Sequence, residues 1–412
     1  MSIKILNKYK VLTRNVFHLG LLHVFSTVIP IFLIPFVVVK IGLTEYGVLA
    51  FALTITNYAL IFVNFGFDFS GAKRISNNRN NLNKIATILT SITIIKLVVF
   101  CLIMSIFFIV VFFIAQTNFY VYLFSLLLIL DSILLPKWFF LGLEKVKYIS
   151  YAYGVSKIIS SILIIVFLSL NYPTFFIPLS YFLGILFTGA YSYYVLFNKL
   201  KIPYQLVSRA NIIEELKHSS KLFLSSISIN IYRNSSMLLA GFILNPVALG
   251  SYALAERIIK AIQSFSSPLT QALFPHFSSM NSKLDLKTFK RQIFTIAKYL
   301  TPVLILLVVL VVTIIPYVSV LIDSADSLSL HRNIYFLSPI ILFGTLNFIF
   351  GFVGLVNLGY ERKFMRLTVI ATLVNIIITP LLILYSPLNV PLPLLITEVL
   401  LFLLIYRNFK RV

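Results

Sequence analysis

Three charged residues stand close together within a long apolar stretch of this sequence. The stretch runs from Asn245 to Pro275, reads as one membrane-spanning helix, and carries Glu256, Arg257 and Lys260 near its middle. A charge at the bilayer centre costs roughly 2.5–3.5 kcal/mol on insertion scales, so it normally faces a partner or a wet cavity. Glu256 and Lys260 are spaced i,i+4 and can pair along one helix face. The excess of one positive charge favours a site for an anionic group; the alternative is an internally neutralised packing cluster.

Other polar residues also fall inside predicted spans. Asn57, Asn64 and Asp68 are spaced by seven and four residues, which predicts one helical face. Lys137 lies near the end of its span, and we expect its long side chain to reach the membrane interface. The remaining candidates are Lys96, Asp131, Lys157, Asn230, Arg233 and Glu398. Without Lys137, five cations face four anions within the spans, which fits either structural ion pairs or a cationic cavity.

The composition is that of a polytopic membrane protein. Of 412 residues, 59% are hydrophobic and 11% are charged. Apolar runs of about twenty residues match the length that a helix needs to cross the hydrocarbon core. The ten-residue alternation of a membrane β-barrel is not evident. A net charge of +22 suggests nucleic acid at first sight, but the basic residues lie in short loops on one side, which argues against that partner.

The apolar runs predict twelve transmembrane helices. We place these helices near 15–39, 46–69, 85–115, 118–142, 149–170, 174–197, 219–243, 247–273, 297–321, 333–357, 365–385 and 389–406. If alternate connections, starting with the N-terminal tail, are assigned to the cytoplasm, they hold 26 Lys and Arg residues against 2 in the other loops. The positive-inside rule then predicts that both termini are cytoplasmic. The basic N-terminus leads into a retained first helix and not into a cleaved signal peptide.

The longest inside connection divides the predicted chain into two halves. We predict an N-terminal six-helix bundle at 1–198, a cytoplasmic linker at 199–218 and a C-terminal six-helix bundle at 219–412. A shift of 203 residues places Gly47, Ala50, Ala52 and Ile55 on Gly250, Ala253, Ala255 and Ile258. Two halves with even numbers of spans have the same orientation, so this repeat predicts an axis along the membrane normal.

Several kinds of chemistry have no support in the sequence. The single cysteine, Cys101, excludes an internal disulfide, and the five histidines show no metal-ligand spacing, so we predict no metal site and no cofactor. No phosphate-binding loop of an ATPase is present, which leaves an ion gradient or the downstream consumption of the product as the driving force. The longest predicted outside loop, around 322–332, is short for a membrane glycan polymerase. These absences favour a transporter over an enzyme.

Sequence motifs across the first two-thirds of the chain resemble one family. Gly42–Gly47, Phe65–Asp68 and Arg74–Ser76 resemble the N-terminal region of the polysaccharide repeat-unit flippases, the O-antigen (Wzx-type) family. Pro136-Lys-Trp138-Phe-Phe-Leu-Gly142-Leu-Glu144 is similar to that family's Pro-x-Trp-Phe-x-x-Gly-Leu-Glu signature, although Leu141 stands where a glutamine is expected. Gly250–Ile258 resembles the helix-eight signature, and Pro275–Ser278 the Pro-x-x-Ser that follows it.

The resemblance implies a fold, a substrate and partners. The fold is that of the multidrug/oligosaccharidyl-lipid/polysaccharide exporter (MOP) superfamily: two six-helix bundles that form a V and open alternately to each face. The implied substrate is undecaprenyl-pyrophosphate carrying one sugar repeat unit, which moves from the inner to the outer leaflet of the bacterial inner membrane. A polysaccharide polymerase and chain-length proteins of O-antigen and lipopolysaccharide synthesis are the implied protein partners.

The candidate residues then acquire roles. Cations can pair with pyrophosphate inside the membrane. The predicted substrate-binding residues are Arg233, Arg257, Lys260, Lys96, Lys157, Asn57, Asn64 and Asn230. The predicted ion-coupling carboxylates are Glu256, Asp68 and Asp131, with Glu256 favoured because Arg257 and Lys260 flank it. The alternatives are a small-molecule antiporter of the same superfamily, which would need an acidic cavity for cationic drugs, and a membrane glycan polymerase.

Overall fold

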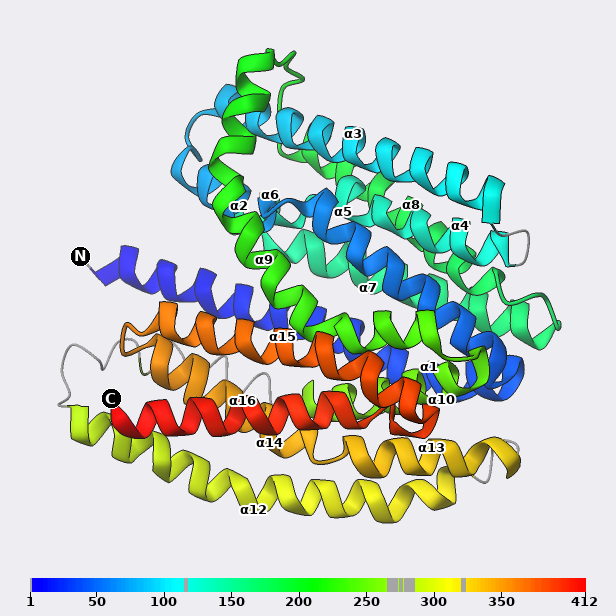
Figure 1. Ribbon diagram of the computed structural model, residues 1–412. Helices are drawn as coiled ribbons and strands as arrows, with labels where there is room; N and C mark the ends of the chain where they lie inside the picture. Colours follow the sequence, from blue (N-terminus) through cyan, green and yellow to red (C-terminus); the bar gives the residue numbers. More distant parts are fainter. Residues whose placement is uncertain (1, 115–117, 265–272, 274–276, 278–285, 320–323) are drawn as a thin grey trace. The chain divides into compact units, whose positions relative to one another are not determined.

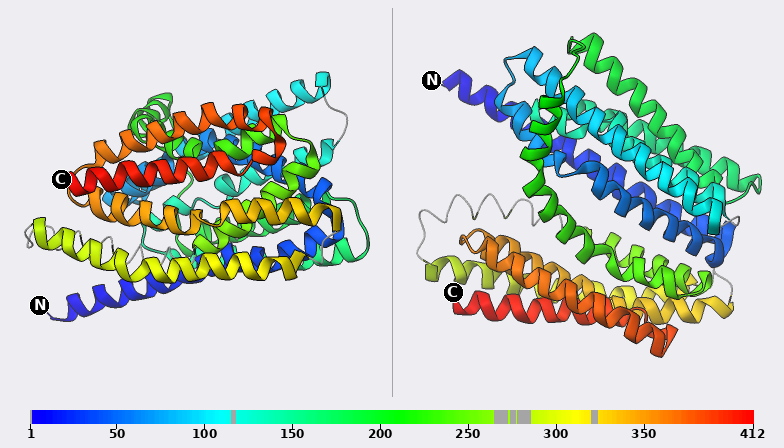
Figure 2. Two further views of the ribbon diagram at one scale, coloured as in Figure 1. Left: turned by 60° about the horizontal axis from the view of Figure 1, so that its bottom comes forward. Right: turned by 45° about the horizontal axis from the view of Figure 1, so that its top comes forward.

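In the computed structural model, the described part of the chain is made of helices joined by connections without regular structure, such as 200–208 (Figures 1 and 2). The described residues are 2–114, 118–264, 273, 277, 286–319 and 324–412, and some side chains within helices, among them Asn230 and Arg233, are outside the description. The helices in chain order are α1 (Ser2–Asn64), α2 (Phe67–Asn77), α3 (Leu82–Ile114), α4 (Phe119–Leu127), η1 (Leu128–Leu130), α5 (Asp131–Leu134), α6 (Lys137–Gly142), α7 (Val146–Ser169), α8 (Phe176–Tyr194), η2 (Val195–Lys199), α9 (Arg209–Ile243), α10 (Pro246–Ser264), α12 (Leu286–Ser319), α13 (Ser324–Leu337), α14 (Ile340–Asn347), η3 (Phe348–Val356), α15 (Glu361–Tyr385), η4 (Pro387–Asn389) and α16 (Leu392–Arg411).

The prediction of an all-α, multi-pass membrane protein is confirmed. Nine helices among the described residues are long and apolar enough to cross a membrane. Each of the twelve predicted spans is mostly helical where the structure describes it, and some are interrupted, as at 65–66 and 135–136. In a membrane-spanning protein, apolar side chains that point outward meet lipid and not water. Large exposed residues such as Phe108 and Leu306 are therefore expected.

Helix α1 runs through the first two predicted spans. It is interrupted at Gly42, where φ is 74° and ψ is 168°. A positive φ is accessible to glycine because it has no Cβ atom. The expected connection at 40–45 is thus a single break at Gly42 and not a loop.

A second break separates Asn64 from Asp68. Helix α1 ends at Asn64, Phe65 and Gly66 have φ of 42° and 75°, and α2 begins at Phe67. The predicted common face of Asn57, Asn64 and Asp68 is wrong, because Asp68 belongs to a different helix from the other two. Periodicity could not reveal this break, since the apolar residues continue through it.

The chain divides into two compact units, which we describe separately. Unit 1 comprises Met1–Lys40 and Ala52–Ile227, and unit 2 comprises Ile41–Phe51 and Ser228–Val412. Helices α1 and α9 each contribute to both units. The predicted bundle boundaries at 198 and 219 stay a prediction.

The core of unit 1 forms where α2, α3, α6 and α7 meet. Its largest buried side chains are Trp138, Phe139 and Phe140 of α6, together with Phe67 of α2. Helices α7 and α8 pack side by side (Figure 1), and Gly184 lies against the hydroxyl groups of Ser156 and Ser160. Small residues at such a contact allow close approach of two helices within a membrane.

The core of unit 2 is rich in phenylalanine. Phe277, Phe289, Phe350 and Phe409 are at most 3% exposed and contact residues of α12, α15, η3 and α16. The wide helical turn η3 brings Gly354 against Phe409. The short segment 41–51 belongs to the same unit, where Gly47 lies against the backbone of α10.

Candidate functional site

Lys96 of α3 lies in the interior of unit 1. It is 2% exposed, and its ammonium group donates hydrogen bonds to Asn64 Oδ1 at 2.9 Å and to the Ser132 carbonyl oxygen at 3.1 Å. The Ser132 carbonyl has no helical donor four residues on, because that residue is Pro136, which lacks an N–H group. Three elements therefore converge on one buried ammonium group.

Lys137 forms an ion pair with Asp131. Its Nζ atom lies 2.8 Å from Asp131 Oδ2 and 4.6 Å from the centre of the Tyr153 ring. The two residues are six apart, and the non-helical conformation of Leu135 and Pro136 between them makes the contact possible. Our expectation that Lys137 extends to the membrane interface did not foresee this partner.

Lys157 of α7 lies between two tyrosine rings. Its Nζ atom is 5.1 Å from the centre of the Tyr153 ring and 4.8 Å from that of Tyr181 on α8. Cation–π contacts of this kind hold an ammonium group without neutralising its charge. Lys157 is partly exposed, so its charge is accessible to a ligand.

We call Lys96, Lys137 and Lys157 the lysine row. Asp131 and Asp68 are the acidic groups near it, and the charges of both act on Lys96 and Lys137. Three cations against two anions leave an excess of one positive charge in this part of unit 1. Among the predicted site residues, Lys96 contacts Asn64 in the structure. Lys157 and Lys137 both lie over the ring of Tyr153. The other predicted site residues of this region are Asp68 and Asp131.

Unit 2 contains Glu256, Arg257 and Lys260, the three charged residues of α10. Lys260 Nζ lies 2.7 Å from Glu256 Oε1, so the predicted i,i+4 ion pair on α10 is confirmed. Glu256 is 7% exposed, whereas the Lys260 side chain is 42% exposed. Arg257 is partly exposed on the same helix. The ion pair joins the buried carboxylate of Glu256 to Lys260, one of the two cations.

A network of uncharged groups fills the interior of unit 2 beside α15. Asn375 Oδ1 accepts hydrogen bonds from Ser235 at 2.8 Å and Ser236 at 3.0 Å, and Asn375 Nδ2 donates to Thr397 at 3.0 Å. Nearby, Asn347 Nδ2 donates to Glu398 Oε2 at 2.7 Å, so Glu398 is engaged within its own unit. The contacts of Asn375 join α9, α15 and α16 through buried polar groups that satisfy one another. The contact of Asn347 joins α14 to α16.

The remaining predicted residues have diverse positions. Asn57 and Asp68 are exposed on α1 and α2. The side chains of Asn230 and Arg233 on α9 lie outside the described residues. Among the described residues, no group of three or more His, Cys, Asp or Glu is arranged to hold a metal ion.

Sequence reasoning missed Lys137, Tyr153 and Tyr181 as parts of the charged region. Tyr153 and Lys157 are spaced i,i+4 on α7, which is a usable signal for a cation–π contact. The spacing of Asp131 and Lys137 gives no such signal, because only the break at Leu135 and Pro136 brings the two residues together.

The signature at 136–144 fixes α6 on α2. Trp138 packs against Gly71, where a Cβ atom would lie 2.6 Å from the indole ring. The Gly142 carbonyl accepts a hydrogen bond of 2.7 Å from Arg79 Nε, and Arg79 Nη2 pairs with Glu144 Oε1 at 2.9 Å. The signature residues therefore have packing roles, and they fix the helix that carries Lys137.

Two solved structures share the fold over most of this chain. The inward-facing conformation of a multidrug resistance MATE family transporter of the MOP superfamily has a TM-score of 0.74 at 12% identity, over 92% of this chain and 94% of that chain. The lipid II flippase MurJ in its inward closed conformation has a TM-score of 0.71 at 14% identity, over 97% of this chain and 87% of that chain. The chain therefore has the fold of MOP-superfamily transporters.

Sequence comparison identifies the family within this class. The profile of the family described as polysaccharide biosynthesis protein matches residues 12–281. The chain belongs to that family. A relative from Escherichia coli (strain K12), named "Putative O-antigen transporter", is 22% identical over 408 residues, which cover 97% of each sequence. The resemblance inferred from the motifs is thereby confirmed.

Proposed function

We propose that this protein is a flippase that moves undecaprenyl-pyrophosphate-linked oligosaccharide repeat units from the cytoplasmic to the outer leaflet of the bacterial inner membrane by alternating access. The observation that carries the proposal is the lysine row of unit 1, with its excess of one positive charge. The family and the name of the Escherichia coli relative support a polysaccharide substrate. A pyrophosphate needs cationic partners in a medium of low dielectric constant.

Within the lysine row, Lys157 is our first choice for direct contact with pyrophosphate. Lys96 is occupied by Asn64 and Ser132, and Lys137 is occupied by Asp131. Lys157 has tyrosine rings as neighbours and is partly exposed. Arg233, Arg257 and Lys260 are the proposed cationic contacts from unit 2, with Asn57, Asn64 and Asn230 as polar contacts to the substrate.

Glu256 is the proposed ion-coupling residue, ahead of Asp68 and Asp131. Its ion pair with Lys260 competes with an anionic substrate when the carboxylate is charged. Protonation of Glu256 would release Lys260, so substrate and proton would be exchanged at neighbouring groups. Transport by vesicles under an imposed pH gradient tests this role. Glu256→Gln should make the rate independent of the gradient, and a variant that still accelerates like the wild type would leave Glu256 as a structural partner.

The proposed topology has both termini in the cytoplasm. After replacement of Cys101 by serine, single cysteines near Asn198 and at Ser329 can be labelled with a membrane-impermeant maleimide. The first should react from the cytoplasmic side and the second from the outside. The reverse pattern would contradict the orientation that the basic loops indicate.

A binding measurement separates the flippase from a small-molecule antiporter. The purified full-length chain is titrated with glycan-bearing undecaprenyl-pyrophosphate, with the glycan-free pyrophosphate lipid and with a cationic dye. We expect both pyrophosphate lipids to bind and the dye to bind at least about tenfold more weakly, which is about 1.4 kcal/mol. Tight binding of the dye without binding of the lipids would favour the antiporter.

A further inference from the structure

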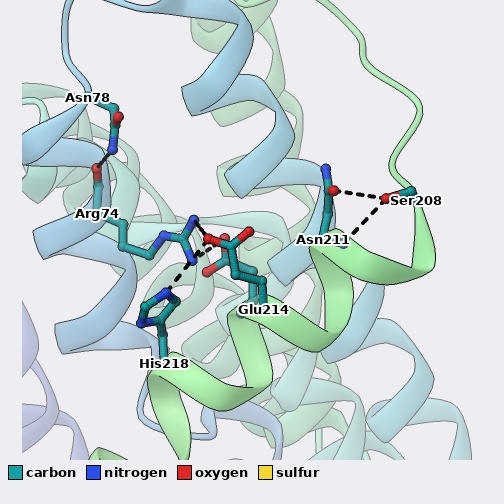
Figure 3. Close-up of polar contacts among 7 residues, drawn as sticks. Arg74, Asn78, Ser208, Asn211, Glu214 and His218 are labelled. Atoms are coloured by element: carbon teal, nitrogen blue, oxygen red, sulfur yellow. Dashed lines mark hydrogen bonds and ion pairs between the residues drawn. The ribbon is translucent and has the colours of Figure 1, made fainter.

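The N-terminal part of α9 is attached to α2 inside unit 1 by a small set of polar contacts. Arg74 of α2 reaches two consecutive glutamates. Its Nη2 lies 2.8 Å from Glu214 Oε1 (Figure 3). Its Nη1 lies 3.3 Å from Glu215 Oε1. One turn before Arg74 on α2 and one turn after Glu215 on α9, the hydroxyl groups of Ser70 and Ser219 share a hydrogen bond of 2.6 Å. We call Ser70, Arg74, Glu214, Glu215 and Ser219 the α2–α9 latch.

The two glutamates of the latch are in different environments. The Glu214 side chain is 55% exposed and also lies 3.7 Å from His218 Nε2. The Glu215 side chain is 3% exposed. Its second oxygen, Oε2, is buried and has no hydrogen-bond partner among the described residues. A charged carboxylate is expensive to hold in such a position, whereas the neutral acid is not.

We propose that Glu215 is a proton-binding site, and that its protonation fastens α9 to α2 at the latch. The geometry that carries the proposal is the environment of the buried Glu215 carboxyl group. Its Oε1 lies beside the guanidinium of Arg74, which also pairs with Glu214, and its Oε2 has no hydrogen-bond partner among the described residues. Arg74 is shared with Glu214, so it cannot fully neutralise two carboxylates. A proton on Glu215 leaves Arg74 and Glu214 as a balanced pair.

The charges that face Glu215 agree with this assignment. Burial raises the pKa of Glu215 from 4.5 to about 7; the guanidinium of Arg74 opposes that effect, and the neighbouring carboxylate of Glu214 adds to it. Glu215 precedes the predicted span at 219–243, so it lies outside the membrane-spanning part of α9. His218 contacts Glu214 and not Glu215.

The direction of the pH effect follows from the raised pKa. When α9 detaches, Glu215 returns to water and its pKa falls to the ordinary value of 4.5. The attached state therefore binds the proton more tightly, and attachment is strongest below that value. The stabilisation is lost as the pH rises through the window from 4.5 to about 7. This is opposite to an ordinary surface ion pair, which strengthens when its carboxylate ionises.

Infrared difference spectroscopy of the full-length protein tests whether Glu215 holds the proton. Titration of the wild type should remove the carbonyl band of a protonated carboxyl group with a midpoint near the pKa of about 7. Glu215→Gln should lack this band, and Glu214→Gln, which alters the exposed neighbour, should keep it. A band that persists in Glu215→Gln, or a midpoint at the ordinary glutamate pKa, would overturn the proposal.

Disulfide cross-linking tests whether the proton fastens the latch. In a Cys101→Ser background, Ser70→Cys and Ser219→Cys place two thiols where the hydroxyl groups now meet. The initial cross-linking rate is divided by that of the same pair in Glu215→Gln, which cancels the pH dependence of the thiols. We expect this ratio to fall roughly twentyfold between about pH 5.5 and about pH 7.5. A ratio that does not change with pH would contradict the link between the proton and the latch.

Discussion

Gly47 and Gly250 pack against each other, and each glycine faces the backbone nitrogen of the other. A Cβ atom on Gly47 would lie 2.9 Å from Gly250 N, and a Cβ atom on Gly250 would lie 3.0 Å from Gly47 N. Each position also faces a carbonyl oxygen, that of Pro246 for Gly47 and that of Leu43 for Gly250. Gly47 and Gly250 are 203 positions apart, and so are Leu43 and Pro246. This separation is the offset of the predicted internal repeat. The crossing thus relates equivalent residues of the two halves of the sequence.

Alanine at either position should destabilise this crossing. Gly47→Ala and Gly250→Ala each place a methyl group within contact distance of backbone that cannot rotate away, and such overpacking costs about 1–3 kcal/mol. Thermal unfolding of the purified protein in detergent measures the effect. Gly20→Ala is the matched control, because a Cβ atom there meets nothing within 4 Å. Equal melting temperatures for Gly47→Ala and Gly20→Ala would show that the crossing is not tight.

The Asp131–Lys137 ion pair should show strong coupling in a double-mutant cycle. Lys137→Met leaves the Asp131 carboxylate, 21% exposed, without its partner, which we expect to cost about 1–3 kcal/mol. Adding Asp131→Asn removes the stranded charge and should restore part of the stability. The free energy of unfolding is measured for the wild type, both single variants and the double variant. Additive losses would indicate that the pair contributes nothing through its charges.

Lys96 should tolerate no apolar replacement of similar length. Lys96→Met keeps the volume but leaves Asn64 Oδ1 and the Ser132 carbonyl without their shared donor. A buried acceptor without a partner costs about 1–3 kcal/mol. Lys84→Met, at an exposed position of the same helix α3, is the control. Similar unfolding temperatures for both variants would mean that the ammonium group of Lys96 does not organise this region.

Asn375 should be the most sensitive member of the polar network in unit 2. Asn375→Leu removes the acceptor of Ser235 and Ser236 and the donor to Thr397, all in the interior. We expect a loss of roughly 2–4 kcal/mol, because several buried groups lose their partner at once. Asn408→Leu removes a single contact, to the Leu404 carbonyl, and is the comparison in the same unfolding assay. A smaller loss at Asn375 than at Asn408 would contradict the network.

The sequence predicted helices and family better than it predicted the environment of each charge. Apolar runs and the distribution of basic residues identify spans because both follow from the bilayer itself. The Glu256–Lys260 pair was predictable because both residues lie on one continuous helix. The contacts of Lys96 and Lys137 depend on breaks near Gly66 and Pro136, and these bring together groups whose spacing in the sequence carries no signal.

The latch could not be predicted for a related reason. Arg74 and Glu215 lie 141 positions apart in the sequence, on a short helix and on a linker that periodicity analysis treated as a connection. The sequence indicated only that residues 199–218 form a cytoplasmic linker. The burial of Glu215 follows from the packing of α9 on α2, which is a property of the folded unit.

The most direct test of the central claim is flipping of a lipid-linked glycan by proteoliposomes. Appearance of the glycan at the opposite face is followed with a membrane-impermeant lectin for the wild type, Lys157→Gln and the control Lys147→Gln, whose lysine contacts Tyr148 elsewhere on α7. We predict that Lys157→Gln lowers the rate about tenfold or more, because it removes one charge-assisted contact to pyrophosphate, and that Lys147→Gln stays near the wild-type rate. Equal rates for Lys157→Gln and the wild type would contradict the account.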